Sequence, residues 1–184
     1  MSEAADKLKR QLALKIGAGA VALAVPLVAS LEGTVLRTYR DPIGILTSCR
    51  GHTGPELKPG QVFTVEQCDI QELQDLIKHA DDLDCIKAPL SDGEKAAMLS
   101  FSFNVGKGKA GVKDGLCVLK SGQPSSIARN LNAGDHAGAC AALMGWTFAG
   151  GKDCKLPENR GACGGLVKRR ELERDVCLGK RGAP

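Results

Sequence analysis

The chain has 184 residues, of which 43% are hydrophobic and 25% are charged. These values are typical of one folded domain, and they exclude long disorder, a collagen-like repeat and a multi-span membrane protein. The formal charge is only +4, and aromatic residues are limited to four Phe, one Trp and one Tyr. We therefore expect no nucleic-acid partner, because such proteins carry a larger basic excess interleaved with aromatic residues.

The N-terminal segment has the charge pattern of an exported chain. Four bases, Lys7, Lys9, Arg10 and Lys15, precede an uncharged run over residues 16–31. Positive charge before an apolar run keeps the N-terminus in the cytoplasm and exports the chain beyond the run. The run is shorter than the roughly twenty residues of a comfortable membrane span. Its many Gly and Ala residues favour a releasable anchor over a permanent anchor, a cleaved signal peptide or a buried helix of a soluble core.

Glu32 comes directly after this run. We expect the helix to continue through Leu31, with a kink at Pro26, so that Glu32 shares one face with Val28 and Leu36. A carboxyl group within an apolar stripe loses solvation, which raises its pKa and suits it to act as a general acid. A surface glutamate at a helix turn is the alternative.

The next stretch has the pattern of a small sheet. Asp41-Pro42 and Gly44 predict a turn, Ile43, Ile45 and Thr47 alternate as in a strand, and residues 50–55 predict a tight loop. One carboxyl group on a helix and a second one in a β-turn are typical of a glycosidase pair.

The rest of the chain is predicted to be helical. Thr64 with Gln67 and Ser91 with Glu94 form capping boxes. They predict one helix over residues 65–83 and a second that ends near Gly106, where glycine provides a left-handed stop. Further helices are expected at residues 124–132, 135–144 and 165–177.

Taken together, the order and spacing of these residues are specific. Glu32, Asp41 and Thr47 have the spacing of the Glu-Asp-Thr triad in phage-type lysozymes, and the chain resembles glycoside hydrolase family 24 endolysins over about residues 31–178. The N-terminal run is similar to that of the signal-anchor-release subgroup. The segments that carry the resemblance are residues 32–33, 39–41, 44–47, 51–54, 100–106, 131–134 with Trp146 and Gly150-Gly151, and 165–171.

The resemblance implies an α+β, lysozyme-like fold that is mostly helical and two-lobed, with a small β-sheet in the N-terminal lobe. Residues 1–31 would form the anchor and residues 32–184 the catalytic domain. Within that domain we expect the small-sheet lobe at about 32–63, a linking helix at about 64–84 and the helical lobe at about 88–178.

The implied activity is that of a muramidase, which hydrolyses the β-1,4 bond between N-acetylmuramic acid and N-acetylglucosamine in peptidoglycan. Glu32 would protonate the leaving oxygen, while Asp41 and Thr47 would activate a water on the opposite sugar face and invert the anomeric centre. Phe103 and Asn104 would bind the substrate. We expect neither a cofactor nor a metal.

The partners would be glycan strands and, before release, the host inner membrane through residues 16–31. The N-terminus would be cytoplasmic, and the released enzyme would be a periplasmic monomer. Cleavage after Ser30 would leave Glu32 near a frayed end, so we expect the anchor to be retained. The first cysteine is Cys49, so thiol exchange within the anchor cannot be the trigger of release. The resemblance implies loss of membrane potential as the trigger.

Two other activities stay open. A lytic transglycosylase would cut the same bond without water, although Asp41 and Thr47 argue against it. A cationic membrane-lysis protein would need no enzymatic site. The basic run Lys168-Arg169-Arg170 could contact glycan or membrane, or form a solvated face, and Trp146 could line a cleft or belong to the core.

The cysteines and histidines point to structure rather than to a metal site. The chain has no His-Glu-x-x-His and no Cys-x-x-Cys motif, and we expect His52 to be structural. Eight cysteines in an exported chain predict disulfides, with Cys154–Cys163 as the shortest plausible closure.

Overall fold

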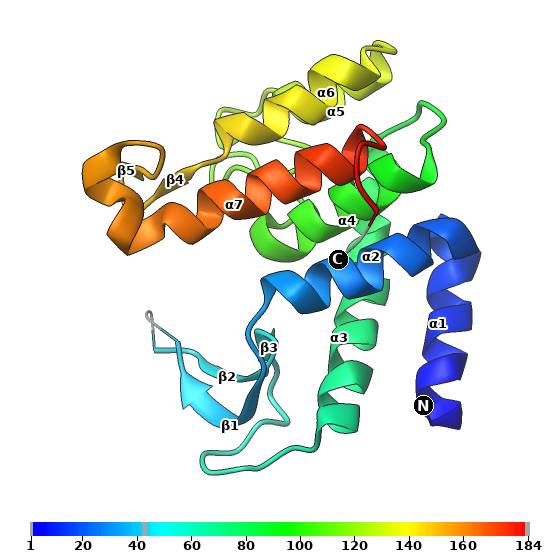
Figure 1. The fold of residues 1–184 in the computed structure, drawn as a ribbon, viewed down its shortest axis with the longest axis vertical. Helices are drawn as coiled ribbons and strands as arrows, with labels where there is room; N and C mark the ends of the chain where they lie inside the picture. Colours follow the sequence, from blue (N-terminus) through cyan, green and yellow to red (C-terminus); the bar gives the residue numbers. More distant parts are fainter. Residues whose placement is uncertain (1, 42–43, 183–184) are drawn as a thin grey trace.

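A computed structural model describes residues 2–41 and 44–182, and it has the expected α+β architecture (Figure 1). A three-stranded antiparallel sheet lies on one side of α3, and the helical lobe covers the end of that helix. The α-helices are α1 (Glu3–Ile16), α2 (Ala18–Leu31), α3 (Val65–Ala80), α4 (Asp92–Val105), α5 (Ser126–Asn132), α6 (His136–Ala142) and α7 (Arg160–Cys177). Three short 3-10 helices are η1 (Asp81–Cys85), η2 (Leu143–Gly145) and η3 (Pro157–Asn159).

The N-terminal segment is broken into two helices. Gly17 separates α1 from α2 with φ 93° and ψ 150°, a conformation that is essentially restricted to glycine, and the two helices are bent by 118°. The expected helix through Leu31 is present as α2, which contains Pro26, and a break that the sequence did not predict lies at Gly17 near the start of the apolar run. An ideal Cβ on Gly19 would lie 1.9 Å from Asp92 Oδ2 at the start of α4, so glycine allows a close approach there.

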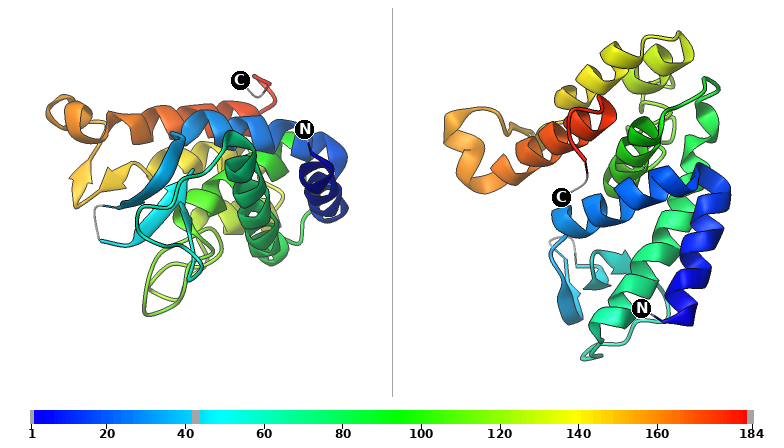
Figure 2. Two further views of the ribbon diagram at one scale, coloured as in Figure 1. Left: turned by 90° about the horizontal axis from the view of Figure 1, so that it is seen from below. Right: turned by 45° about the vertical axis from the view of Figure 1, so that its right-hand side comes forward.

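Both N-terminal helices pack into the helical body. α1 runs beside α3 and α2 lies against α4 (Figures 1 and 2). Side chains from α1 and α2 share one core with α3, α4 and α7, and its buried Leu, Ile and Val members are Leu12, Ile16, Val21, Leu27, Val28, Leu73, Leu76, Leu99 and Val176. Among the described residues, no single helix is long and apolar enough to cross a membrane, and α1 and α2 meet that requirement only as a bent pair.

The small sheet has the order β1 (Val35–Arg40), β2 (Leu46–Cys49) and β3 (His52–Thr53), all antiparallel. Tyr39 pairs with Thr47, and the register shifts between Val35 and Tyr39. The segment expected to be only a loop at residues 50–55 therefore contains β3. Of the predicted turn and strand before it, Pro42 and Ile43 lie outside the described residues.

The two capping boxes are confirmed. The Thr64 hydroxyl accepts from the Gln67 amide at 3.2 Å, and Gln67 Oε1 accepts from the Thr64 amide at 2.8 Å, so α3 starts at Val65. Ser91 and Glu94 form the same pair of bonds before α4, which ends at Gly106 with φ 87°.

In the second lobe, α7 packs against α4, α6 packs against α7, and α5 packs against α6. Its core gathers around Phe101 and contains Leu116, Ile127, Leu131 and Leu143. The final helix begins at Arg160, earlier than expected, and continues past a non-helical Cys163. A short hairpin of β4 (Phe148–Ala149) and β5 (Lys152–Asp153) precedes it.

All eight cysteines form disulfides, as predicted for an exported chain. The expected Cys154–Cys163 bond is confirmed. The other bonds are Cys49–Cys68, Cys85–Cys117 and Cys140–Cys177.

Candidate active site

Glu32 is the residue that ends α2. Its amide still donates to the Val28 carbonyl at 3.0 Å, but its own backbone is extended, with φ -99° and ψ 126°. The chain then passes through Gly33 into β1, so Leu36 lies on a strand. The expected helical face of Val28, Glu32 and Leu36 is therefore absent, because Gly33 and the β-branched Thr34 and Val35 favour ending the helix.

The Glu32 carboxyl forms an ion pair with a buried arginine. Arg169 Nη1 donates to Glu32 Oε1 at 2.5 Å, and the two side chains are 8% and 22% exposed, respectively. This contact also corrects the solvated-face interpretation of the basic run. Lys168 is exposed, but Arg169 and Arg170 are buried.

Tyr39 links the three predicted catalytic residues. Tyr39 and Thr47 are directly opposed in the β1–β2 pairing, so their side chains point to the same face of the sheet. Burial raises the pKa of Tyr39, and the negative charges of Glu32 and then Asp41 raise it further. The phenol therefore lies in the electrostatic field of both carboxylates.

The second carboxyl and the threonine are held by the β1–β2 turn. Asp41 Oδ1 accepts from the Ile45 amide at 2.8 Å. Thr47 is 3% exposed, and its hydroxyl donates to the Ile45 carbonyl at 3.1 Å. Both side chains are thus fixed by main-chain groups of the same turn.

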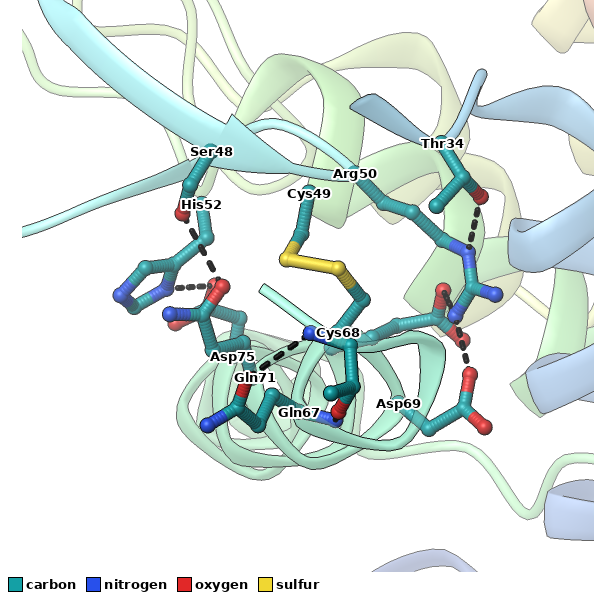
Figure 3. The surroundings of a disulfide bond; sticks show 12 residues. Thr34, Ser48, Cys49, Arg50, His52, Gln67, Cys68, Asp69, Gln71 and Asp75 are labelled. Atoms are coloured by element: carbon teal, nitrogen blue, oxygen red, sulfur yellow. Dashed lines mark hydrogen bonds and ion pairs between the residues drawn. A yellow bond between two sulfur atoms is a disulfide. The ribbon is translucent and has the colours of Figure 1, made fainter. Parts of the chain in front are cut away.

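The hairpin is fastened to α3 by side chains on β2 and β3 (Figure 3). Cys49 forms its disulfide with Cys68, and Ser48 Oγ donates to Gln71 Oε1 at 3.0 Å. The His52 ring lies 2.6 Å from carboxylate oxygens of Asp75 and Glu56. Burial lowers the pKa of His52, but hydrogen bonds to Glu56 and then Asp75 outweigh it and raise the pKa. These contacts agree with the structural role expected for His52.

Arg50 ties the segment after Glu32 to the same helix. Its guanidinium donates to Thr34 Oγ1 at 3.0 Å, Asp69 Oδ1 at 2.7 Å and Glu72 Oε2 at 3.1 Å (Figure 3). Glu72 is 3% exposed, and burial raises its pKa to about 7 although Arg50 opposes the rise. Arg50 and Glu72 border a cavity of about 620 Å³ that α1, α2 and α3 enclose.

The side chains of the two predicted substrate-binding residues, Phe103 and Asn104, contact different parts of the protein although the residues are consecutive on α4. Asn104 is exposed at the end of α4, its Oδ1 accepts from Arg170 Nη2, and it lines a pocket of about 540 Å³. Trp146 both lines this pocket and packs edge-on against Phe101, so it belongs to a pocket wall and to the core. Phe103 lies instead beside the core that α1 and α2 share with α3, α4 and α7, and its ring centroid is 5.7 Å from that of His79.

The sequence interpretation missed the ionic network behind Glu32. Glu173 is fully buried and pairs with both Arg169 and Arg170. The available signal was the spacing, because Glu173 lies four residues after one arginine and three after the other, which places all three on one helix face.

No group of three or more His, Cys, Asp or Glu side chains in the described part of the chain is arranged to hold a metal ion. The side chains available for chemistry are the Glu32 carboxyl, which pairs with the buried Arg169, and the Tyr39 phenol, the Asp41 carboxyl and the Thr47 hydroxyl of the hairpin. Glycoside hydrolysis uses two carboxyl groups as acid and base.

Comparison with known proteins gives consistent matches. The family model described as phage lysozyme matches residues 29–173. A SAR-endolysin of Bacteriophage PS119 is 36% identical over 178 residues, covering 93% of this chain and 94% of the relative, and a SAR-endolysin of Enterobacteria phage P21 is 34% identical with 93% and 95% covered. Among solved structures, the endolysin from Escherichia coli O157:H7 phage FAHEc1 has a TM-score of 0.67 at 25% identity, covering 88% of this chain and 94% of that chain. A variant of P22 lysozyme has a TM-score of 0.65 at 28% identity, covering 84% and 94%.

Proposed function

The chain belongs to the phage lysozyme family, and from this membership we propose that Glu32, Asp41 and Thr47 carry out its catalytic step. The protein is a phage endolysin, a glycoside hydrolase that cleaves peptidoglycan and lyses the bacterial host. The observation that carries the residue assignment is the position of Tyr39, whose phenol is in the field of both carboxylates and directly opposite Thr47.

In the proposed reaction, protonated Glu32 gives its proton to the glycosidic oxygen of the leaving N-acetylglucosamine. The Asp41 carboxylate and the Thr47 hydroxyl hold a water on the opposite face of the muramic acid ring. As the oxygen of this water bonds to the anomeric carbon, Asp41 accepts a proton from the water. Attack from the face opposite the leaving group inverts the configuration at the anomeric carbon. Because Arg169 pairs with Glu32 in the free enzyme, part of that contact must be given up when Glu32 takes up its proton.

The assignment is tested by loss of turbidity of purified peptidoglycan. We expect Glu32→Gln and Asp41→Asn to lose activity by at least about a hundredfold, the usual contribution of a positioned acid or base. Thr47→Ala should lose less, because Asp41 can still bind the water. The exposed Glu66 provides a matched control, and Glu66→Gln should retain activity. Near-normal lysis by folded Glu32→Gln would overturn the assignment.

We propose that Asn104 and Phe103 contribute to glycan binding. Support for Asn104 comes from its exposure and from the pocket that it shares with Trp146. Phe103 stays in the proposal on the family resemblance alone. Asn104→Ala should therefore raise KM more than Phe103→Ala when initial rates are measured on soluble glycan fragments.

The N-terminal 31 residues are proposed to be an uncleaved anchor that is released from the inner membrane into the periplasm, ahead of a catalytic domain over residues 32–184. The N-terminus would first be cytoplasmic, and the released enzyme a monomer. Burial of Leu12, Leu27 and Val28 in the core supports retention, because cleavage would remove these side chains from it. Mass spectrometry of the periplasmic enzyme should find residues 2–31 still attached, and a mature N-terminus at Leu31 would contradict this.

A further inference from the structure

A fully buried carboxylate lies behind the proposed active site. Glu173 on α7 is 0% exposed and accepts a hydrogen bond from Ser100 Oγ at 2.7 Å. Arg169 Nε donates to Glu173 Oε1 at 3.2 Å, and Arg170 Nη1 donates to Glu173 Oε2. One carboxylate therefore holds two consecutive arginines of the same helix.

The two arginines reach separate parts of the proposed site. Arg169 uses Nη1 to contact Glu32. Arg170 donates to Asn104 Oδ1 and, from Nε, to the Trp146 carbonyl at 3.2 Å, while its guanidinium carbon lies 4.6 Å from the Phe101 ring centroid. Glu173 is thus one hydrogen-bonded residue away from both Glu32 and Asn104.

We propose that Glu173 is a positioning residue that holds Arg169 toward Glu32 and Arg170 toward Asn104, and that its negative charge offsets part of the positive charge that the two arginines present to Glu32. This inference rests on the proposed role of Glu32 as the general acid. Glu173 does not touch the substrate and acts only through the two arginines.

Several charged groups act on Glu32. Arg169 on α7 is paired with it, and the charges of Arg170 on α7 and Glu72 on α3 also act on it, while the neutral phenol of Tyr39 on β1 lies in its field. In the α7 cluster, Arg169 and Arg170 each carry a positive charge and Glu173 carries a negative charge. The cluster therefore has a net charge of one positive charge. Without the Glu173 charge, Glu32 would face two positive charges, which favours its ionised form.

The test is the pH–activity profile of Glu173→Gln on purified peptidoglycan. A general acid must be protonated to act, so activity falls on the basic limb of the profile, where the acid loses its proton. In Glu173→Gln this basic limb should move to lower pH by about one unit. At a fixed pH on that limb, the rate should fall about tenfold. The matched control is Glu171→Gln, which removes the same charge from an exposed position on the same helix and should leave the limb in place.

A second variant gives the opposite sign. Arg170→Met removes one positive charge from the cluster, so its basic limb should move to higher pH. A residue with only a structural role would lower activity in both variants without moving the limb in opposite directions. A limb unchanged in both folded variants would overturn the proposal.

Folding is controlled with the double variant Glu173→Gln with Arg170→Met. Removing one member of a buried ion pair is strongly destabilising, whereas replacing both members is often tolerated. The double variant keeps the net charge of the cluster, so its limb should match that of the native enzyme. A shifted limb in the folded double variant would overturn the proposal, whether or not the single variants fold. Full activity of Glu32→Gln would instead refute the proposed role of Glu32 as general acid. The contacts of Glu173 with Arg169 and Arg170 would not be affected by that result.

Discussion

Gly17 is the residue at which the proposed anchor must change shape. In the structure it lies between α1 and α2 at φ 93° and ψ 150°. A straight anchor across a bilayer would instead place residue 17 inside one continuous helix. Replacing Gly17 with leucine should therefore penalise the folded-back form and favour the membrane form at the same time.

The size of the effect can be worked out from the backbone. An added Cβ would meet no atom closer than 3.7 Å, so the penalty in the folded-back form is conformational rather than steric. A non-glycine residue in this region costs about 1–3 kcal/mol. Leucine in place of glycine stabilises a continuous helix by about 0.7 kcal/mol. The sum of about 2–4 kcal/mol would shift the equilibrium toward the membrane form by about 30- to 1,000-fold.

The matched control is Ala22→Leu. Ala22 is exposed on α2, so leucine there adds a similar apolar side chain to the membrane form without straining the folded-back form. We expect Gly17→Leu to delay lysis much longer than Ala22→Leu. When cells are fractionated, a larger share of the Gly17→Leu protein should remain in the membrane fraction than of the Ala22→Leu protein. Equal delays in the two variants would show that anchor hydrophobicity alone controls release and that the Gly17 conformation has no part in it.

Two further predictions concern stability. Loop-closure entropy predicts that replacing Cys140 and Cys177, which are 37 residues apart, costs about 3.8 kcal/mol in the free energy of unfolding, whereas replacing Cys154 and Cys163, 9 apart, costs about 2.6 kcal/mol. Denaturant titration of the two double variants checks this order of stability losses, and the reverse order would contradict it. In a separate test, full reduction of the disulfides should lower Tm markedly in thermal melts. The Glu72 carboxyl has an ordinary pKa of 4.5 when unfolded and a pKa of about 7 when folded. Between these values the folded state binds more protons, so Tm should fall as pH rises from about 4.5 to about 7. Glu72→Gln should flatten that slope, and an unchanged slope would refute the assignment.

Local signals in the sequence predicted much of the helical scaffold. The capping boxes at Thr64 and Ser91 and the stop at Gly106 depend only on neighbouring residues, and each occurs in the structure. Cys154–Cys163 was accessible for the same reason, because only nine residues separate the two cysteines. The fold class was predicted from the family resemblance, which local pattern alone does not supply.

The surroundings of Glu32 could not be predicted from neighbouring residues. The Arg169 contact joins residues 137 positions apart, and it depends on the tertiary packing of α7 against α4 and α2. The break at Gly17 was missed for a related reason. A run of Gly and Ala is compatible with a continuous helix, and the packing of α1 on α3 and of α2 on α4 favours the bend. The basic run at residues 168–170 was misinterpreted because burial of two arginines depends on Glu173, Asn104 and the Trp146 carbonyl.

Cleavage of purified peptidoglycan in water enriched in oxygen-18 tests the central claim most directly. If Asp41 activates a water that attacks the anomeric carbon, mass spectrometry should find one labelled oxygen at each new N-acetylmuramic acid end, and the products should form as the inverted anomer. Folded Glu32→Gln protein should release neither labelled nor unlabelled ends. Unlabelled anhydro ends from the native enzyme would identify a transglycosylase and contradict the proposed hydrolytic mechanism.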